Sequence, residues 1–174
     1  MLYTVYGILM QVTGFRMRDQ FQLDAQHATQ HAGIALMAIA AALVATQMTL
    51  AKIHVSTSGA QRRIVLIAGA LGLLGLCLLI AEIPFQAQLL CSALFGLSLG
   101  AFMPFTLNML THRAHNAGDQ TRIGGLSGAA QGLGMVIGPL LGASSYRANP
   151  HAPYWMAAGF MVIVFGIYAR ASRT

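Results

Sequence analysis

The sequence predicts an all-helical protein that crosses a membrane six times. First, hydrophobic residues make up 56% of the 174 residues and charged residues only 8%, whereas soluble domains carry about 25% charged residues. Second, the mean hydropathy is +0.65. Third, the apolar residues gather in six runs that are separated by short polar connectors. Because backbone groups in lipid must bond within their own segment, and barrel strands would alternate in hydrophobicity, these runs are predicted to be helices.

The composition also excludes several classes of protein. The chain has too little charge to cover the surface of an ordinary water-soluble enzyme, and it is too apolar to be disordered. The formal net charge of +6 does not indicate nucleic-acid binding, because the ten Lys and Arg residues form no basic stripe with interleaved aromatics. Cys77 and Cys91 lie inside apolar runs, which predicts buried thiols rather than a disulfide or a metal site.

The six runs differ in length. A membrane helix needs roughly 20 mainly apolar residues. The first run follows Met1 directly, is short for a full crossing, and lacks the basic region of a secretory signal. We expect one transmembrane domain over residues 1–174, with spans at about residues 2–16, 33–50, 64–81, 85–110, 123–146 and 154–169.

Basic residues in the loops predict the orientation of the bundle. Six crossings place both termini on one side. That side would carry seven basic residues, namely Lys52, Arg62, Arg63, Arg113, Arg122, Arg170 and Arg173. The other side would carry three, namely Arg16, Arg18 and Arg147. Because cytoplasmic loops are enriched in Lys and Arg, both termini are predicted to be cytoplasmic.

Glycine recurs at helical spacing inside the spans. Gly124, Gly128 and Gly132 are four residues apart, as are Gly134, Gly138 and Gly142. Residues four apart share a helix face, and small residues there let neighbouring backbones approach closely. A proline inside a span removes one hydrogen bond and kinks the helix. We therefore expect tight packing, together with bending or gating at Gly96, Gly100, Pro104, Gly138, Pro139 and Gly142.

Two spans resemble helices of the major facilitator superfamily of transporters. The fifth, GGLSGAAQGLGMVIGPLLGASSY, resembles the eleventh helix of that family, with a G-P-x-x-G element at Gly138, Pro139 and Gly142. The fourth, with GLSLGAFMPFTLNML, resembles the tenth. The connector FRMRDQFQLDAQHATQHAG resembles the outer loop after the seventh helix. The resemblance covers nearly the whole chain as helices seven to twelve and is closest to bacterial drug–proton antiporter-like members.

One loop departs from the family pattern. Members commonly carry a G-x-x-x-D-R-x-G-R-like loop between helices eight and nine, whereas the loop here is AKIHVSTSGAQRR. Gly59, Arg62 and Arg63 are its only remnants, and the acid is absent.

The resemblance also implies a role and partners. Family members have two six-helix halves with the substrate site between them. The chain is therefore expected to be the C-terminal half of a secondary transporter: a fragment, a truncated gene product or a separately encoded half. It would move a small molecule by alternating access, with efflux as one direction, in the lipid bilayer of a bacterial inner membrane beside an N-terminal six-helix half.

Few polar residues lie near the expected middle of the membrane. Gln11, Ser98 and Gln131 are the candidates for lining a substrate cavity, and hydrogen bonding between helices is the alternative for each. Gln47 and Asn108 lie toward cytoplasmic ends, where gate or interface contacts are expected.

No Asp or Glu lies deep in a span, because Asp19 and Glu82 fall at outer ends. A carboxylate for proton coupling is therefore expected in the other half.

Other charged and titratable groups lie in the connectors. Arg16, Arg18 and Asp19 form either an outer ion-pair cluster or part of a solvated loop. Two histidine pairs have spacings that could place both rings on one helix face, but only the first has a further ligand nearby, Asp24. The pairs are His27 with His31 and His112 with His115. Loop histidines are the default interpretation, and neither a metal nor a cofactor is expected.

Two alternatives to a transporter remain. One is a membrane scaffold that packs but does not transport. The other is a rhomboid-like intramembrane serine protease, because Ser127 lies in a G-x-S-G sequence. The only later histidine, His151, would lie across the membrane, roughly 30 Å away, and a base must come within hydrogen-bond reach. A G-x-S-x-G match at residues 96–100 lies in an apolar run rather than a strand–turn–helix. No catalytic residue is therefore predicted.

Overall fold

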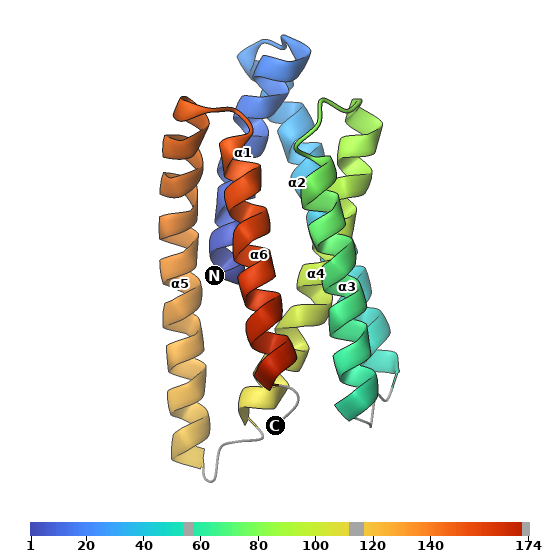
Figure 1. Cartoon of the computed structure of the whole chain (residues 1–174), viewed down its shortest axis with the longest axis vertical. Helices are drawn as coiled ribbons and strands as arrows, with labels where there is room; N and C mark the ends of the chain where they lie inside the picture. Colours follow the sequence, from blue (N-terminus) through green and yellow to red (C-terminus); the bar gives the residue numbers. More distant parts are fainter. Residues whose placement is uncertain (54–57, 112–116, 172–174) are drawn as a thin grey trace.

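The computed structural model describes residues 1–53, 58–111 and 117–171, and these form six helices and no strand. Figure 1 shows them as a bundle of long rods. The helices are α1 (Leu2–Phe21), α2 (Ala25–Lys52), α3 (Ser58–Leu78), α4 (Phe85–Thr111), α5 (Ala117–Ala148) and α6 (Ala152–Ala171). The prediction of an all-helical fold is confirmed.

Both ends of the bundle can be followed in Figure 1. The turns at residues 22–24, 79–84 and 149–151 lie at the top, which we call the upper end. The starts of α3 and α5 and the end of α6 lie at the bottom, which we call the lower end. The most extensive contacts join α1 to α5, α2 to α4 and α3 to α4. α6 packs against α3 and α1.

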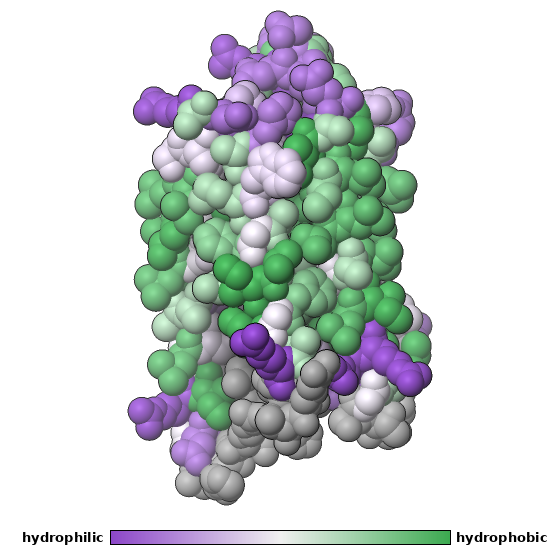
Figure 2. All heavy atoms as spheres, viewed as in Figure 1, coloured by the Kyte–Doolittle hydropathy of each residue, from purple (hydrophilic) through white to green (hydrophobic). Residues whose placement is uncertain are grey.

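Five of the helices are long and apolar enough to cross a membrane, among the residues described. These spans are Ala25–Lys52, Gly59–Leu78, Phe85–Leu107, Gly118–Ala148 and Ala152–Arg170. α1 is not among them, because Arg16, Arg18 and Asp19 lie in its C-terminal part. Figure 2 shows a broad apolar belt with hydrophilic residues toward both ends. Only 11% of the apolar window of α2 is buried, so the rest of its surface is suited to lipid.

The helices extend beyond the expected spans, most of all in the polar connector after the first span. α1 continues to Phe21, where Gln22 adopts a left-handed conformation (φ 51°) and donates its backbone N–H to Arg18. α2 begins after Asp24, whose side chain accepts the backbone N–H of His27 at 2.9 Å. Because both helix ends are capped, the turn between them is only three residues long.

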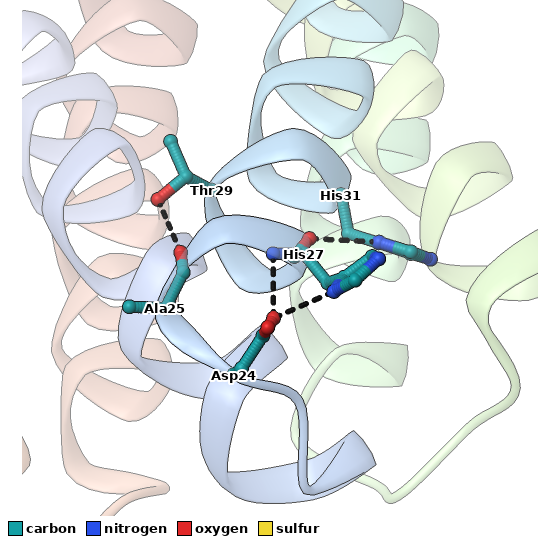
Figure 3. A network of polar contacts seen from close by, with 5 residues as sticks. All are labelled: Asp24, Ala25, His27, Thr29 and His31. Carbon is teal, nitrogen blue, oxygen red and sulfur yellow. Dashed lines mark hydrogen bonds and ion pairs between the residues drawn. The ribbon is translucent and has the colours of Figure 1, made fainter.

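The cap at Asp24 belongs to a small polar network (Figure 3). Asp24 also contacts Nδ1 of His27 at 2.7 Å, and Nδ1 of His31 lies 2.9 Å from the His27 carbonyl oxygen. Thr29 donates its hydroxyl to the Ala25 carbonyl at 2.7 Å. The backbone N–H of His27, followed by its ring, holds the pKa of Asp24 below its usual value. The carboxylate therefore stays charged as a helix cap at neutral pH.

The two glycine series of α5 have different surroundings. A Cβ added at Gly138 would lie 2.6 Å from the Thr4 carbonyl oxygen and 2.8 Å from Cα of Gly7. Gly134 and Gly142 also face the α1 backbone closely. At Gly124, Gly128 and Gly132, by contrast, no described atom lies within 4 Å of such a Cβ. The second series therefore forms the seam with α1, and the first series is open.

Glycines also hold α4 between two neighbours. A Cβ at Gly100 would lie 2.7 Å from the Leu43 carbonyl oxygen on α2, and Gly96 packs against the same helix. On the other side, a Cβ at Gly75 of α3 would lie 2.7 Å from the Cys91 carbonyl oxygen on α4. Both α4 and α5 continue as α-helix through Pro104 and Pro139. The expected packing role of these glycines is visible, whereas bending at the prolines stays a prediction.

Replacing Gly138 with Leu is expected to separate α1 from α5. The new side chain would collide with backbone atoms that cannot rotate away, so a loss of at least about 1–3 kcal/mol in the free energy of unfolding is expected. Thermal unfolding in detergent, followed by circular dichroism, measures the loss. Gly128→Leu is the matched control, since its site is open. Equal midpoints for the two variants, or full transport by Gly138→Leu beside a partner half, would contradict this assignment.

Candidate functional site

A large cavity of about 1110 Å³ lies toward the lower end of the bundle. All six helices contribute to its lining, which is mainly apolar. The polar groups are amides and hydroxyls, from Tyr3, Gln47, Gln61, Thr106, Ser127, Gln131 and Tyr168. Such a cavity suits a mostly apolar ligand that a few polar groups orient.

Aromatic rings form one wall of this cavity. Phe102 packs edge-on against Phe165 and Tyr168, with ring centroids 5.4 Å apart in both pairs. Val65, which is fully buried, completes this cluster behind the lining. Farther toward the upper end, buried residues such as Phe95 fill the bundle. The cavity therefore lies below the filled part of the bundle.

The three predicted cavity residues lie in different surroundings. Gln131 lines the cavity. Gln11 is half-buried on α1 and does not belong to the lining. Ser98 is fully buried in the seam between α3 and α4, where its Oγ lies 2.6 Å from the position of a Cβ added at Gly72. The hydroxyl of Ser98 has no hydrogen-bond partner among the described residues. Only one of the three therefore faces the cavity.

The sequence predicted another role for some of the lining residues and did not single out others. Gln47, expected at a gate or interface, lines the cavity, whereas the side chain of Asn108 lies outside the described residues. Gln61 and Thr106 were missed because they lie near the ends of apolar runs, away from the expected midplane. Among the expected gating positions, Pro104 also belongs to the lining. A search restricted to the middle of each span therefore overlooks a cavity near one end.

Arg16 is buried near the upper end, with only 6% of its surface exposed. Its two terminal nitrogens donate to the carbonyl oxygens of Leu79 and Ala81, and its Nε donates to Oε1 of Gln20 at 2.9 Å. Its guanidinium carbon lies 4.8 Å from the ring centroid of Tyr154. The interpretations of Arg16 as part of an ion-pair cluster or a solvated loop are therefore both wrong. The planar guanidinium instead donates hydrogen bonds to backbone carbonyls.

The carbonyls that Arg16 binds lie in the turn after α3, beyond its last residue Leu78. Backbone carbonyls in a turn lack the partners that a helix provides. Gln20 binds the same turn, because its Nε2 donates to the Ile83 carbonyl oxygen at 2.7 Å. Gln88 of α4, only 1% exposed, donates to Oε1 of Gln20 at 2.6 Å. Arg16, Gln20 and Gln88, which we call the upper seal, thus tie α1 to the α3–α4 turn.

Asp19 bonds to a different partner from the one expected. Its Oδ2 accepts the hydroxyl of Tyr146 at 2.8 Å, which joins the upper ends of α1 and α5. Phe15 packs against the same ring at a centroid distance of 5.5 Å. A cleft of about 150 Å³ lies beside these residues and is also lined by Glu82 and His151.

The arrangement separates the residues of the protease alternative. Ser127 lines the lower cavity, whereas His151 lines the cleft at the upper end. The part of α5 between Ser127 and the upper turn is roughly 30 Å long at 1.5 Å per residue. Residues 96–100 lie within the continuous helix α4, without a strand or a turn. Neither serine has the surroundings of a nucleophile.

The first histidine pair lies at the start of α2, where His27 contacts Asp24. The described part of the chain contains no group of three or more residues that could hold a metal ion. His112 and His115 lie outside the described residues.

Comparison with known proteins identifies a family. A family model described as the Major Facilitator Superfamily matches residues 1–173. No curated protein and no solved structure matches the chain. The family match covers all six helices.

Arg16→Gln is expected to loosen the upper seal. The substitution leaves the carbonyls of Leu79 and Ala81 without their donor. Leu79 is buried, and an unpaired buried carbonyl costs about 1–3 kcal/mol, whereas Ala81 is exposed. Thermal unfolding in detergent should show this loss. Arg18→Gln is the control, because Arg18 lies on the same helix but is exposed and should change stability by less than about 0.5 kcal/mol. If both variants unfold at the same temperature, the upper seal contributes nothing.

Proposed function

The chain belongs to the major facilitator superfamily, a family of membrane transporters, and we propose that it forms the C-terminal six-helix half of a secondary transporter. Its substrate would be a small molecule moved by alternating access. The drug–proton antiporter-like subtype and the efflux direction are supported by the resemblance of the spans at residues 96–110 and 124–146 to the tenth and eleventh helices of such members.

The lower cavity carries this proposal. Alternating access requires a path that is open to one side of the membrane while it is closed to the other. A cavity of about 1110 Å³ at the lower end, together with the upper seal at the opposite end, has this one-sided character. Gln47 and Gln131 offer amide donors and acceptors that could orient a substrate within it.

The second half of the transporter would complete the site. Substrate sites of such folds lie between two repeats. The open glycine series of α5 and the large exposed side chains Leu126 and Leu133 leave this helix without a described neighbour along its lower part. We propose that an N-terminal six-helix half covers part of this surface. It would also supply the carboxylate for proton coupling, because all four acids of this chain lie outside the middles of its helices.

The charge distribution supports a cytoplasmic lower end. Five basic residues lie at the lower ends of the described helices, namely Lys52, Arg62, Arg63, Arg122 and Arg170. Positively charged residues are enriched on the cytoplasmic side of membrane proteins. We therefore propose that both termini are cytoplasmic and that the membrane is a bacterial inner membrane.

Thiol labelling in intact and opened cells tests the orientation. In a chain whose Cys77 and Cys91 are replaced by Ala, Arg63→Cys and Arg122→Cys should react with a membrane-impermeant maleimide only after the cells are opened. Arg147→Cys should react in intact cells, because it lies at the upper end. Labelling of Arg63→Cys and Arg122→Cys from opposite faces would overturn the six-span arrangement itself.

Transport by the complete assembly tests the function. An upstream reading frame encoding six further spans is expected, and its product is to be expressed together with this chain. Gln131→Leu and Gln47→Leu should lower transport of a drug-like fluorescent substrate by about tenfold or more, because each removes a polar group from the cavity.

Gln26→Leu, an exposed position at the start of α2, is the matched control and should transport normally. If no transport depends on the chain, or if all three variants behave alike, a scaffold role becomes the better explanation.

A further inference from the structure

The described charged residues of this chain are unevenly distributed between its two ends. The sequence carries +6 and contains only four acidic residues. At the upper end three basic and three acidic residues balance, namely Arg16, Arg18 and Arg147 with Asp19, Asp24 and Glu82. At the lower end of the described helices five basic residues face one acid, Asp119. No other acidic side chain of the chain can neutralise them.

Among these basic residues, Arg62 and Arg63 have the least favourable electrostatic surroundings for a positive charge. Lys52 and Arg170 lie in the last turns of α2 and α6, where the negative end of the helix dipole favours a cation. Arg62 and Arg63 instead lie near the start of α3, where the dipole is positive. Their charge and that of the helix terminus therefore add together, which creates a local demand for an anion.

The guanidinium of Arg62 also has an unused donor. Its Nε is buried, yet it has no hydrogen-bond partner among the described residues. A buried N–H without an acceptor is unfavourable unless a ligand supplies one. Arg62 as a whole is partly exposed.

α6 brings a third arginine to the lower end beside α3. Val65, one turn after Arg62, packs in one cluster with Tyr168 of α6. Arg62 lies close enough to the Tyr168 hydroxyl to interact with it electrostatically. Arg170 follows two residues later on α6 and is exposed. Arg62, Arg63 and Arg170, which we call the basic cluster, thus come from two neighbouring helices at the lower end.

We propose that the basic cluster binds the phosphodiester headgroup of an anionic phospholipid. Guanidinium groups form strong charge-assisted hydrogen bonds with phosphate oxygens, and basic residues at the membrane surface attract anionic lipids. Large apolar side chains follow the arginines along the same two helices, with Ile67 of α3 63% exposed and Ile167 of α6, which also lines the lower cavity, 59% exposed. Figure 2 shows this transition from hydrophilic lower end to apolar belt.

The apolar neighbours decide between a lipid and a free phosphate ion. A lipid can place its headgroup on the arginines and its acyl chains along Ile67 and Ile167. Inorganic phosphate would use only the charges. Gln61 and Tyr168 line the lower cavity, so the bound headgroup would lie at its rim. This site does not depend on the transport role, because the chain can bind lipid whether or not it transports.

Native mass spectrometry of the purified full chain in neutral detergent tests the site. Dioleoylphosphatidylglycerol is expected to bind more tightly than dioleoylphosphatidylcholine. Arg62→Gln should weaken binding of the anionic lipid by about fivefold, and Arg63→Gln with Arg170→Gln should weaken it further, since each basic residue contributes about this factor. Arg18→Gln with Arg147→Gln removes two exposed cations from the upper end and should leave binding unchanged.

Several results would overturn the assignment. Equal binding of the two lipids, or an equal loss in the upper-end control, would show that no specific site exists. Competition by inorganic phosphate at millimolar concentration would identify a free anion as the occupant. Circular dichroism checks that each variant keeps its helices. If Arg62→Gln does not fold, the variant with Arg63 and Arg170 replaced decides the question, because both of these side chains are exposed.

Discussion

Close contact between helix backbones, made possible by glycine, is the constraint on which this bundle depends. In lipid, helices gain little from burying apolar side chains against each other, so packing must come from close approach. Gly138 against Gly7, Gly100 against Leu43 and Gly75 against Cys91 provide that approach in the three most extensive helix pairs. The large apolar side chains can then face outward, which gives the broad belt of Figure 2.

This arrangement also explains why the polar groups gather at the two ends. The middle of the bundle is filled by buried side chains such as Phe95 and Met161. A cavity remains toward the lower end, where α1 and α2 contribute Met1 and Ile53 to its lining. At the upper end, Arg16 donates hydrogen bonds to the turn after α3. The large cavity therefore lies toward one end of the bundle and the upper seal at the other.

Local signals in the sequence predicted the helices well, because each apolar run must satisfy its own backbone. The glycine spacing predicted a packing seam, but spacing alone could not distinguish Gly138 from Gly128. Gly134, Gly138 and Gly142 meet α1 between Tyr3 and Val12, whereas Gly128 precedes the part of α5 that α1 accompanies. Arg16 could not be placed either, since its partner Leu79 is 63 residues away in the chain. Ser98 looked like a cavity residue because depth in the membrane says nothing about which neighbour a helix face meets.

The pairing of α1 with α5 has a mechanical consequence. Pro139 lies on the seam, and its Cδ would be only 2.9 Å from a Cβ added at Gly7. Above it, Asp19 and Tyr146 join the same two helices. α1 therefore packs alongside Pro139, which removes one backbone hydrogen bond from α5. If α5 bends at Pro139, α1 must move together with it as one rigid pair. The bonds of Arg16 to the turn after α3 would hold the upper end of this pair in place.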